Sequence, residues 1–245
     1  MLMAKPRLLI TRFAPDAQRL ADFLNAQGIF ALAQPLLSVQ KTAEFANARF
    51  VLTKSYDYII AVSRNAVDYT DQALAGESWP NSDYLAVGKG TQVRLHGATR
   101  QTVQIPSGQF DSEGLLALPC LAQLSGKKIL ILRGVGGREL LAQTLTARGA
   151  VVEYYQPYQR VAINLNGSQM VNKRQQEGIN GAIISSVELL ERLIEVVPID
   201  DRNWLTQLVI YVPSRRIASH ATALGWTDVK VLSGMLDQQI ADYFN

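Results

Sequence analysis

The sequence predicts an α/β fold of two similar lobes, each built on a parallel sheet. Short aliphatic or β-branched runs alternate with helical patterns along the whole chain, which is typical of βαβ units. The two halves of the sequence repeat one another. With 245 residues, 48% of them apolar and 18% charged, the chain is long enough for two domains of ordinary size.

The apolar runs place the strands, and glycines mark the helix ends between them. Leu20, Phe23 and Leu24 share one helical face before Gly28, and a similar helix ends at Gly149. We expect strands at residues 7–12, 29–34, 57–62, 83–88, 102–105, 128–133, 151–156, 181–185, 208–213 and 228–232.

In the repeat, "LLITRFAPDAQRLADFLNAQG" aligns with "ILILRGVGGRELLAQTLTARG", so that Arg12 corresponds to Arg133 (133 − 12 = 121). Further along, Ser63 matches Ser186 (186 − 63 = 123), and Val87-Gly88 is matched to Val212-Pro213. Two copies of about 120 residues predict two lobes. A hinge or linker is expected near 36–42 and 157–165, after the repeated prolines.

The composition excludes several classes of protein. No apolar run approaches the roughly 18 residues of a membrane span, so we expect a cytoplasmic protein without membrane contact. One cysteine and two histidines argue against a disulfide or a metal site. The net charge of +3, without a run of Lys and Arg among aromatics, gives no sign of a nucleic-acid partner.

Small residues and cations follow the predicted strands, where parallel sheets bind ligands. This predicted anion-binding rim consists of Thr11-Arg12, Ser63-Arg64-Asn65, Gly88-Lys89-Gly90-Thr91, Arg133-Gly134 and Ser214-Arg215-Arg216. Arg138 and Arg216 are expected in the first turns of helices, where a cation is unfavourable unless an anion binds there.

The residues alone leave the ligand open. "RGVGG" lacks the Lys-Ser/Thr ending of a triphosphate loop and the G-x-G-x-x-G spacing of a dinucleotide loop. No triad or carboxylate pair is evident, but a phenol of "YYQPY", Tyr154–Tyr158, could donate a proton. A non-catalytic two-lobed protein that binds an anionic metabolite and a nucleotide-using transferase both stay open.

The ordered segments resemble the uroporphyrinogen-III synthase family over essentially the full chain. The resemblance lies in "LLITR", "DYIIAVSRNAV", "AVGKGTQVRLHGA", "PSGQFDSEGLLALP", "GKKILILRGVGGRELLAQTLTARGAVVEYYQPYQR", "IISSVELL" and "VPSRRIASHATALG". The most specific part is the long "LRGVGGREL" to "PYQR" segment together with "SEGLL".

The resemblance implies two flavodoxin-like or Rossmann-like lobes joined by a two-stranded linker, with residues 1–36 plus 162–245 in one lobe and 40–158 in the other. It implies a monomeric lyase of porphyrin and heme biosynthesis that needs no cofactor. Its substrate would be hydroxymethylbilane, a linear tetrapyrrole with carboxylate arms, which the family closes to uroporphyrinogen III with inversion of ring D and loss of water. A polyanionic substrate suits the predicted rim.

The resemblance also implies roles for individual residues. Tyr158 takes the place of the family's tyrosine and would be the acid that helps water leave. Ser63, Thr91 and Ser186 would be cleft hydroxyls, and Arg12, Arg133 and Arg138 would bind acetate or propionate arms. At "VPSRRIA" the chain departs from the family pattern, so Ser214 and Arg216 are substrate-binding candidates on the residue pattern alone.

Overall fold

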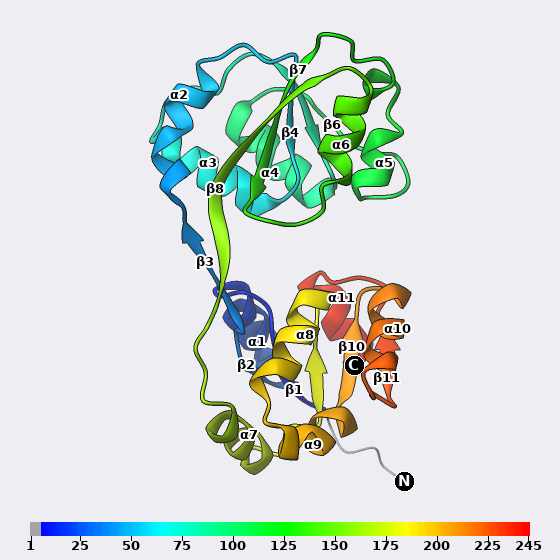
Figure 1. Ribbon diagram of the computed structural model, residues 1–245. Helices are drawn as coiled ribbons and strands as arrows, with labels where there is room; N and C mark the ends of the chain where they lie inside the picture. The colour runs from blue at the N-terminus through cyan, green and yellow to red at the C-terminus, as the bar shows by residue number, and fades with distance from the viewer. Residues whose placement is uncertain (1–5) are drawn as a thin grey trace. The chain divides into compact units, whose positions relative to one another are not determined.

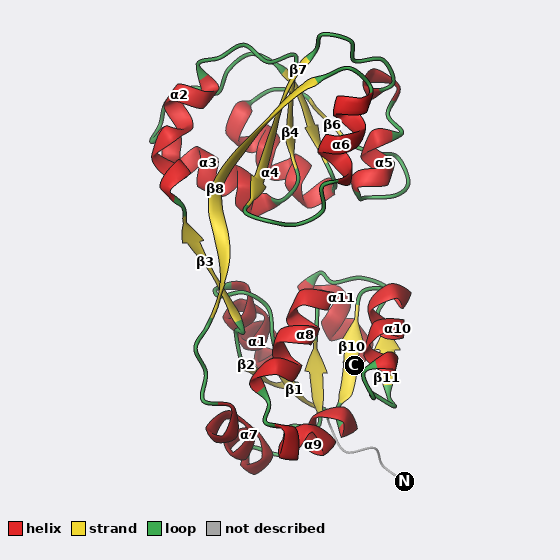
Figure 2. Cartoon of the chain, viewed as in Figure 1, coloured by secondary structure: helices red, strands yellow, loops and turns green. Residues whose placement is uncertain are grey.

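The computed structural model describes residues 6–245 and divides the chain into two compact units (Figure 1). The first unit comprises the chain up to Ser38 together with Val161–Asn245, and the second comprises Val39–Arg160. Both consist of a sheet with helices on its two faces (Figure 2), and the strands are parallel, as predicted, apart from the edge strand β3. Within residues 6–245, no helix has the length and apolar character that a membrane crossing requires.

The sheet of the first unit has the order β11-β10-β9-β1-β2. Side chains alternate along β1, so Leu8 and Ile10 pack against α1 and α11, while Leu9 packs toward α7 to α10. The elements are β1 (Arg7–Ile10), α1 (Asp16–Ala26), β2 (Phe30–Ala33), α7 (Gly167–Gln176), β9 (Gly181–Ile183), α8 (Val187–Val196), α9 (Arg202–Gln207), β10 (Val209–Val212), α10 (Arg215–Ala223), β11 (Val229–Val231) and α11 (Asp237–Phe244).

The second unit has the order β3-β8-β7-β4-β5-β6. Ile129 and Ile131 of β7 pack toward α5 and α6, and Leu130 and Leu132 pack toward α2, α3 and α4. The elements are β3 (Leu37–Lys41), α2 (Ala48–Leu52), β4 (Tyr58–Ala61), α3 (Arg64–Leu74), β5 (Asp83–Ala86), α4 (Lys89–Thr99), β6 (Val103–Gln104), α5 (Ser112–Leu116), β7 (Lys128–Gly134), α6 (Leu140–Ala147) and β8 (Val151–Ala162).

The two sheets share one strand register. Leu8 lies opposite Gly181 in the first sheet, and Ile129 lies opposite Tyr58 in the second. In the repeat, Leu8 corresponds to Ile129 (129 − 8 = 121) and Tyr58 corresponds to Gly181 (181 − 58 = 123), so the two pairs are equivalent. The approximate match of Val87-Gly88 to Val212-Pro213 shifts by one residue, because Gly88 and Ser214 hold the same N-cap position before α4 and α10.

Residues 36–42, expected as a hinge or linker and not as a strand, contain strand β3. The Ile163 N–H donates to the Leu36 carbonyl at 3.0 Å and the Thr42 N–H to the Pro157 carbonyl at 3.1 Å. The residue number rises from 36 to 42 on β3 while it falls from 163 to 157 on β8, so the two strands are antiparallel. They form the two-stranded linker that the resemblance implies, and they make β8 longer than the predicted 151–156.

Candidate functional site

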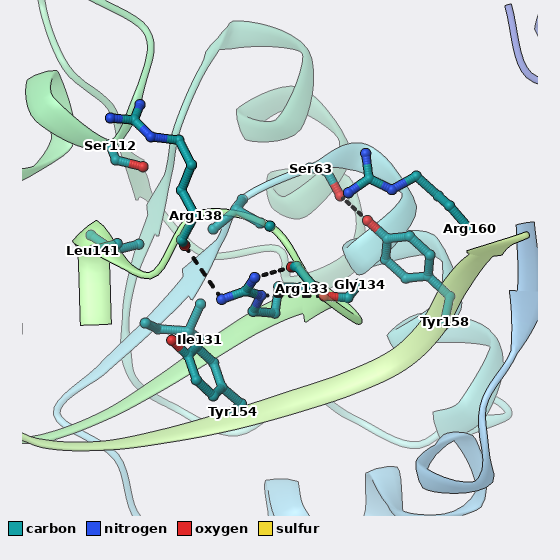
Figure 3. A pocket seen from close by; sticks show the side chains of 13 residues that line it. Ser63, Ser112, Ile131, Arg133, Gly134, Arg138, Leu141, Tyr154, Tyr158 and Arg160 are labelled. Atoms are coloured by element: carbon teal, nitrogen blue, oxygen red, sulfur yellow. Dashed lines mark hydrogen bonds between the residues drawn. The ribbon is translucent and has the colours of Figure 1, made fainter. Parts of the chain in front are cut away.

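The second unit has a cavity where its strand order reverses. From β4 the chain continues to β5 and β6 on one side, and from β7 it continues to β8 on the other. The crevice at the carboxyl ends of two such strands is the usual ligand site of an open parallel sheet. The cavity there measures about 260 Å³ (Figure 3) and is lined by Val62, Ser63, Ser112, Ile131, Arg133, Gly134, Gly136, Gly137, Arg138, Leu141, Tyr154, Tyr158 and Arg160.

Three predicted serines cap helices at the carboxyl ends of strands. The Ser63 hydroxyl oxygen accepts the Ala66 N–H at 3.1 Å at the start of α3. In the first unit, Ser186 caps α8 and Ser214 caps α10 with the same extended backbone conformation. Ser, Thr and Asp are favoured at this position because their side-chain oxygen satisfies an otherwise unpaired helix N–H.

Tyr158 reaches the cavity from β8 and meets Ser63. Its hydroxyl lies 2.9 Å from the Ser63 hydroxyl, and either oxygen can be the donor. The ring packs beside Tyr69, with 5.3 Å between ring centroids. Of the neighbouring tyrosines, Tyr155 donates instead to the Phe45 carbonyl, and Tyr154 donates to Glu139 at 2.6 Å. Burial and the bond to Glu139 raise the pKa of Tyr154, which makes it a weaker acid.

Arg133, predicted to bind a substrate carboxylate, lies beneath the glycine loop with only 6% of its surface exposed. Its guanidinium donates to the Gly136 carbonyl and, at 2.9 Å, to Glu139. Gly136 and Gly137 have φ values of 76° and 96°, which favour glycine. The Gly136 carbonyl therefore accepts a hydrogen bond from Arg133 of the same chain, and this bond holds the loop in its conformation.

Arg138 does not lie in the first turn of a helix, so that prediction was wrong. The positive φ values at Gly136 and Gly137 delay α6, which begins at Leu140. Arg138 is exposed and pairs with Glu113 of α5, at 3.1 Å for one nitrogen. Hydrogen bonding to this arginine lowers the pKa of the Glu113 carboxyl.

Thr91 and Arg216 both lie in first turns, of α4 and α10. Thr91 is buried and is not among the residues that line the cavity. Arg216 is exposed.

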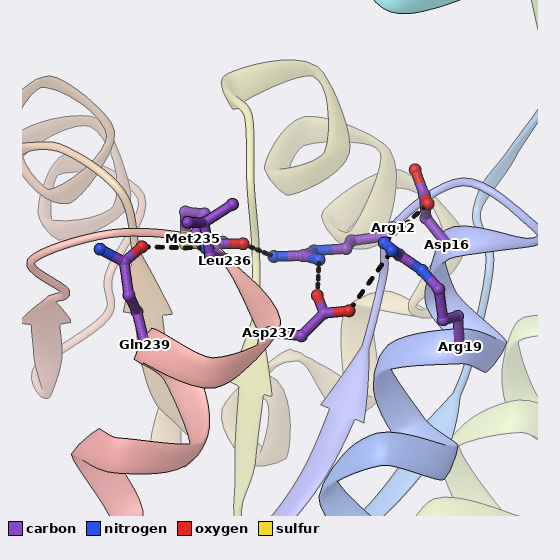
Figure 4. Close-up of polar contacts among 7 residues, drawn as sticks. All are labelled: Arg12, Asp16, Arg19, Met235, Leu236, Asp237 and Gln239. Carbon is purple, nitrogen blue, oxygen red and sulfur yellow. Dashed lines mark hydrogen bonds and ion pairs between the residues drawn. The ribbon is translucent and has the colours of Figure 1, made fainter. Parts of the chain in front are cut away.

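Arg12 binds a segment of its own unit (Figure 4). The guanidinium donates to the Met235 carbonyl at 2.6 Å and to the Asp237 carboxylate at 3.1 Å. Burial lowers the pKa of Arg12, and Asp237 partly offsets that effect. Arg12 and its repeat partner Arg133 thus both bind carbonyl groups of the chain.

Sequence reasoning did not single out Ser112 and Arg160, which also line the cavity. Both stand in segments that carry the resemblance, "SEGLL" and "PYQR". The partners Glu113 and Asp237 had no sequence signal, because they lie 25 and 225 residues from the arginines that they bind.

A comparison with protein families agrees with this architecture. The family model described as uroporphyrinogen-III synthase HemD matches residues 18–233. The chain belongs to the uroporphyrinogen-III synthase family. Uroporphyrinogen-III synthases of Salmonella typhimurium and Escherichia coli are 37% and 36% identical to it over 231 residues, covering 91% of this chain and 94% of each relative.

Solved structures of uroporphyrinogen-III synthases share the fold. A mutant of the Thermus thermophilus protein aligns with a TM-score of 0.66 at 16% identity and covers 97% of both chains. The Helicobacter pylori protein aligns with a TM-score of 0.61 at 13% identity, again over 97% of both.

Proposed function

We propose that this protein is a uroporphyrinogen-III synthase, a lyase that closes hydroxymethylbilane to uroporphyrinogen III with inversion of ring D and loss of one water. Membership of the family supports the reaction. The proposed position of the active site rests on the Tyr158–Ser63 hydrogen bond at the cavity of the second unit. With a volume of about 260 Å³, this cavity holds only part of a four-ring substrate.

Tyr158 acts as the acid in this proposal. The C–O bond of the ring A hydroxymethyl group breaks, and the hydroxyl leaves as water with the phenol proton. The exocyclic carbon of the resulting azafulvenium cation bonds to the substituted α-carbon of ring D, giving a spirocyclic intermediate. The bond from this α-carbon to the bridge toward ring C then breaks, and the bridge carbon bonds to the other α-carbon of ring D. The proton released when the last ring regains aromaticity returns to the phenolate, so the product is the substrate less one water.

Ser63 stabilises the phenolate that forms in this step. Its oxygen already accepts the Ala66 N–H, which leaves the hydroxyl hydrogen for Tyr158. The N-terminus of α3 adds a partial positive charge at the same place. Both interactions are stronger with the phenolate than with the neutral phenol, and interactions that strengthen in the transition state accelerate a reaction.

The cations of the cavity suit the carboxylate arms of the substrate. Arg138 and Arg160 line the cavity and can pair with carboxylates. Arg133 holds the glycine loop in place through its hydrogen bond to the Gly136 carbonyl. Arg138 already pairs with Glu113, so a substrate carboxylate would exchange with a carboxylate of the chain. Arg12, Thr91, Ser186, Ser214 and Arg216 stay predicted substrate contacts.

The test supplies hydroxymethylbilane, oxidises the cyclic product and separates the type I and type III porphyrins. The uncatalysed reaction gives the uninverted type I isomer, so a folded synthase is expected to yield type III. Heat-denatured protein serves as the control. Only type I product would contradict the proposal, and bound but unchanged substrate would indicate a binding protein.

A further inference from the structure

Strand β8 contains one extra residue just before Tyr158. From Lys128 opposite Val151 to Leu132 opposite Tyr155, paired residues are 23 apart in the chain (151 − 128; 155 − 132). Gly134 lies opposite Tyr158, which is 24 residues on (158 − 134), so β8 bulges between these two pairs. Bulges near functional sites commonly redirect a side chain.

The bulge sets the face on which Tyr158 lies. In a regular strand, residues three apart point to opposite faces of the sheet. Here Tyr155 and Tyr158 both pack in the same core cluster, on the side of α3. Ser63 caps α3, so the extra residue brings the Tyr158 hydroxyl to the Ser63 hydroxyl.

Gly134 provides the space that the ring occupies. A Cβ atom at this position would lie 2.6 Å from Cε2 and 2.7 Å from Cζ of Tyr158, and 3.0 Å from its hydroxyl oxygen. Carbon atoms do not approach so closely without displacement. Gly134 is not among the glycines with positive φ, so its backbone would accept alanine. Glycine is therefore required at this position because the Tyr158 ring fills the space of a side chain, and not because of the backbone conformation.

We infer that Gly134 is a positioning residue for Tyr158: its missing side chain lets the ring lie on the β7 backbone with the hydroxyl at Ser63. This inference rests on the proposed role of Tyr158 as the acid. Tyr69 closes another side of the ring, with 5.3 Å between centroids, so a ring pushed away from Gly134 loses its alignment.

The experiment combines Gly134→Ala with Tyr158→Phe and measures kcat and KM for hydroxymethylbilane. Gly134→Ala is expected to lower kcat roughly 10- to 100-fold, with KM nearly unchanged, because a small displacement of a catalytic group has effects of this size. In the Tyr158→Phe protein, Gly134→Ala should cause little further loss, since the displaced hydroxyl is already absent. Gly97→Ala is the matched control, because Gly97 is exposed on α4 with no atom within 4 Å of the added carbon.

The outcomes separate the inference from the proposed function. Full activity of Tyr158→Phe would remove the proposed acid and this inference with it. A slow Tyr158→Phe beside a fully active Gly134→Ala would overturn the inference alone, as would equal losses from Gly134→Ala in both backgrounds. If Gly134→Ala fails to fold, Gly134→Ala/Tyr158→Ala should unfold cooperatively again, because the clashing ring is gone, and a pair that stays unfolded would overturn the inference.

Discussion

Ser63 has two hydrogen-bonding partners, and their arrangement sets what Tyr158 can do. The Ser63 oxygen caps α3 through Ala66, and the same hydroxyl group meets the Tyr158 phenol. The neighbouring phenols are committed elsewhere, Tyr154 to Glu139 and Tyr155 to the Phe45 carbonyl. Tyr158 therefore differs from them in its partner and not in its residue type.

Replacing Tyr158 by Phe should lower the rate of type III formation roughly 100-fold, the usual range for removing a general acid. Substrate binding should persist, because the ring and the cations of the cavity remain. Single-turnover kinetics and a binding titration separate the two effects. Tyr155→Phe is the control, since its hydroxyl bonds to Phe45 outside the cavity lining and its loss should leave the rate unchanged. An undiminished rate in Tyr158→Phe would exclude Tyr158 as the acid.

The loops after the edge strands β6 and β11 each lead into a helix whose first turn pairs with an arginine. The segments Ser107–Asp111 and Ser233–Asp237 correspond in the repeat (233 − 107 = 126), and both lead into a helix. In the first unit Arg12 binds Asp237, and in the second unit Arg138 binds Glu113. Both units thus have an ion pair near this loop, but at positions that do not correspond, because the same shift places Asp111 at Asp237 and Glu113 at Gln239 (239 − 113 = 126).

The ion pair between Arg12 and Asp237 of α11 is expected to stabilise the folded protein. Asp237→Asn should lower the free energy of unfolding by roughly 1–3 kcal/mol, because the side chains of Arg12 and Asp237 are only 11% and 19% exposed and the arginine would lose its counter-ion. Urea unfolding monitored by circular dichroism measures it. The exposed Asp200 supplies the control Asp200→Asn, expected within about 0.5 kcal/mol of the parent. Equal stabilities of the two variants would show that the pair contributes nothing.

The hydrophobic cores follow the division into units. Two of the buried clusters lie wholly within residues 39–160, and the other two lie wholly outside that range. A unit that buries its own core can fold alone. The first unit has no such continuous piece of chain, because its β1 and β9 pair across 172 residues of separation, as the Thr11–Ile183 bond shows.

Residues 39–160 expressed alone should therefore fold and unfold cooperatively in urea, with Trp79 as the fluorescent reporter. A shorter piece, 39–140, lacks Leu141, Leu145 and Tyr155 of the cores and should not fold. A gradual, non-cooperative transition of 39–160 would show that the second unit depends on the rest of the chain.

By itself, the sequence determined the repeat, the capping serines and the strand positions other than β3 and the second half of β8, because alternation, helical periodicity and N-cap chemistry are local. The resemblance identified the family and singled out Tyr158 as the proposed acid. Only the tertiary structure showed that Arg133 lies beneath its own loop, that Arg12 and Arg138 bind Asp237 and Glu113, and that Gly134 and a bulge place Tyr158 beside Ser63. These features depend on groups that approach one another only after the chain has folded, and residue spacing along the chain carries no record of such contacts.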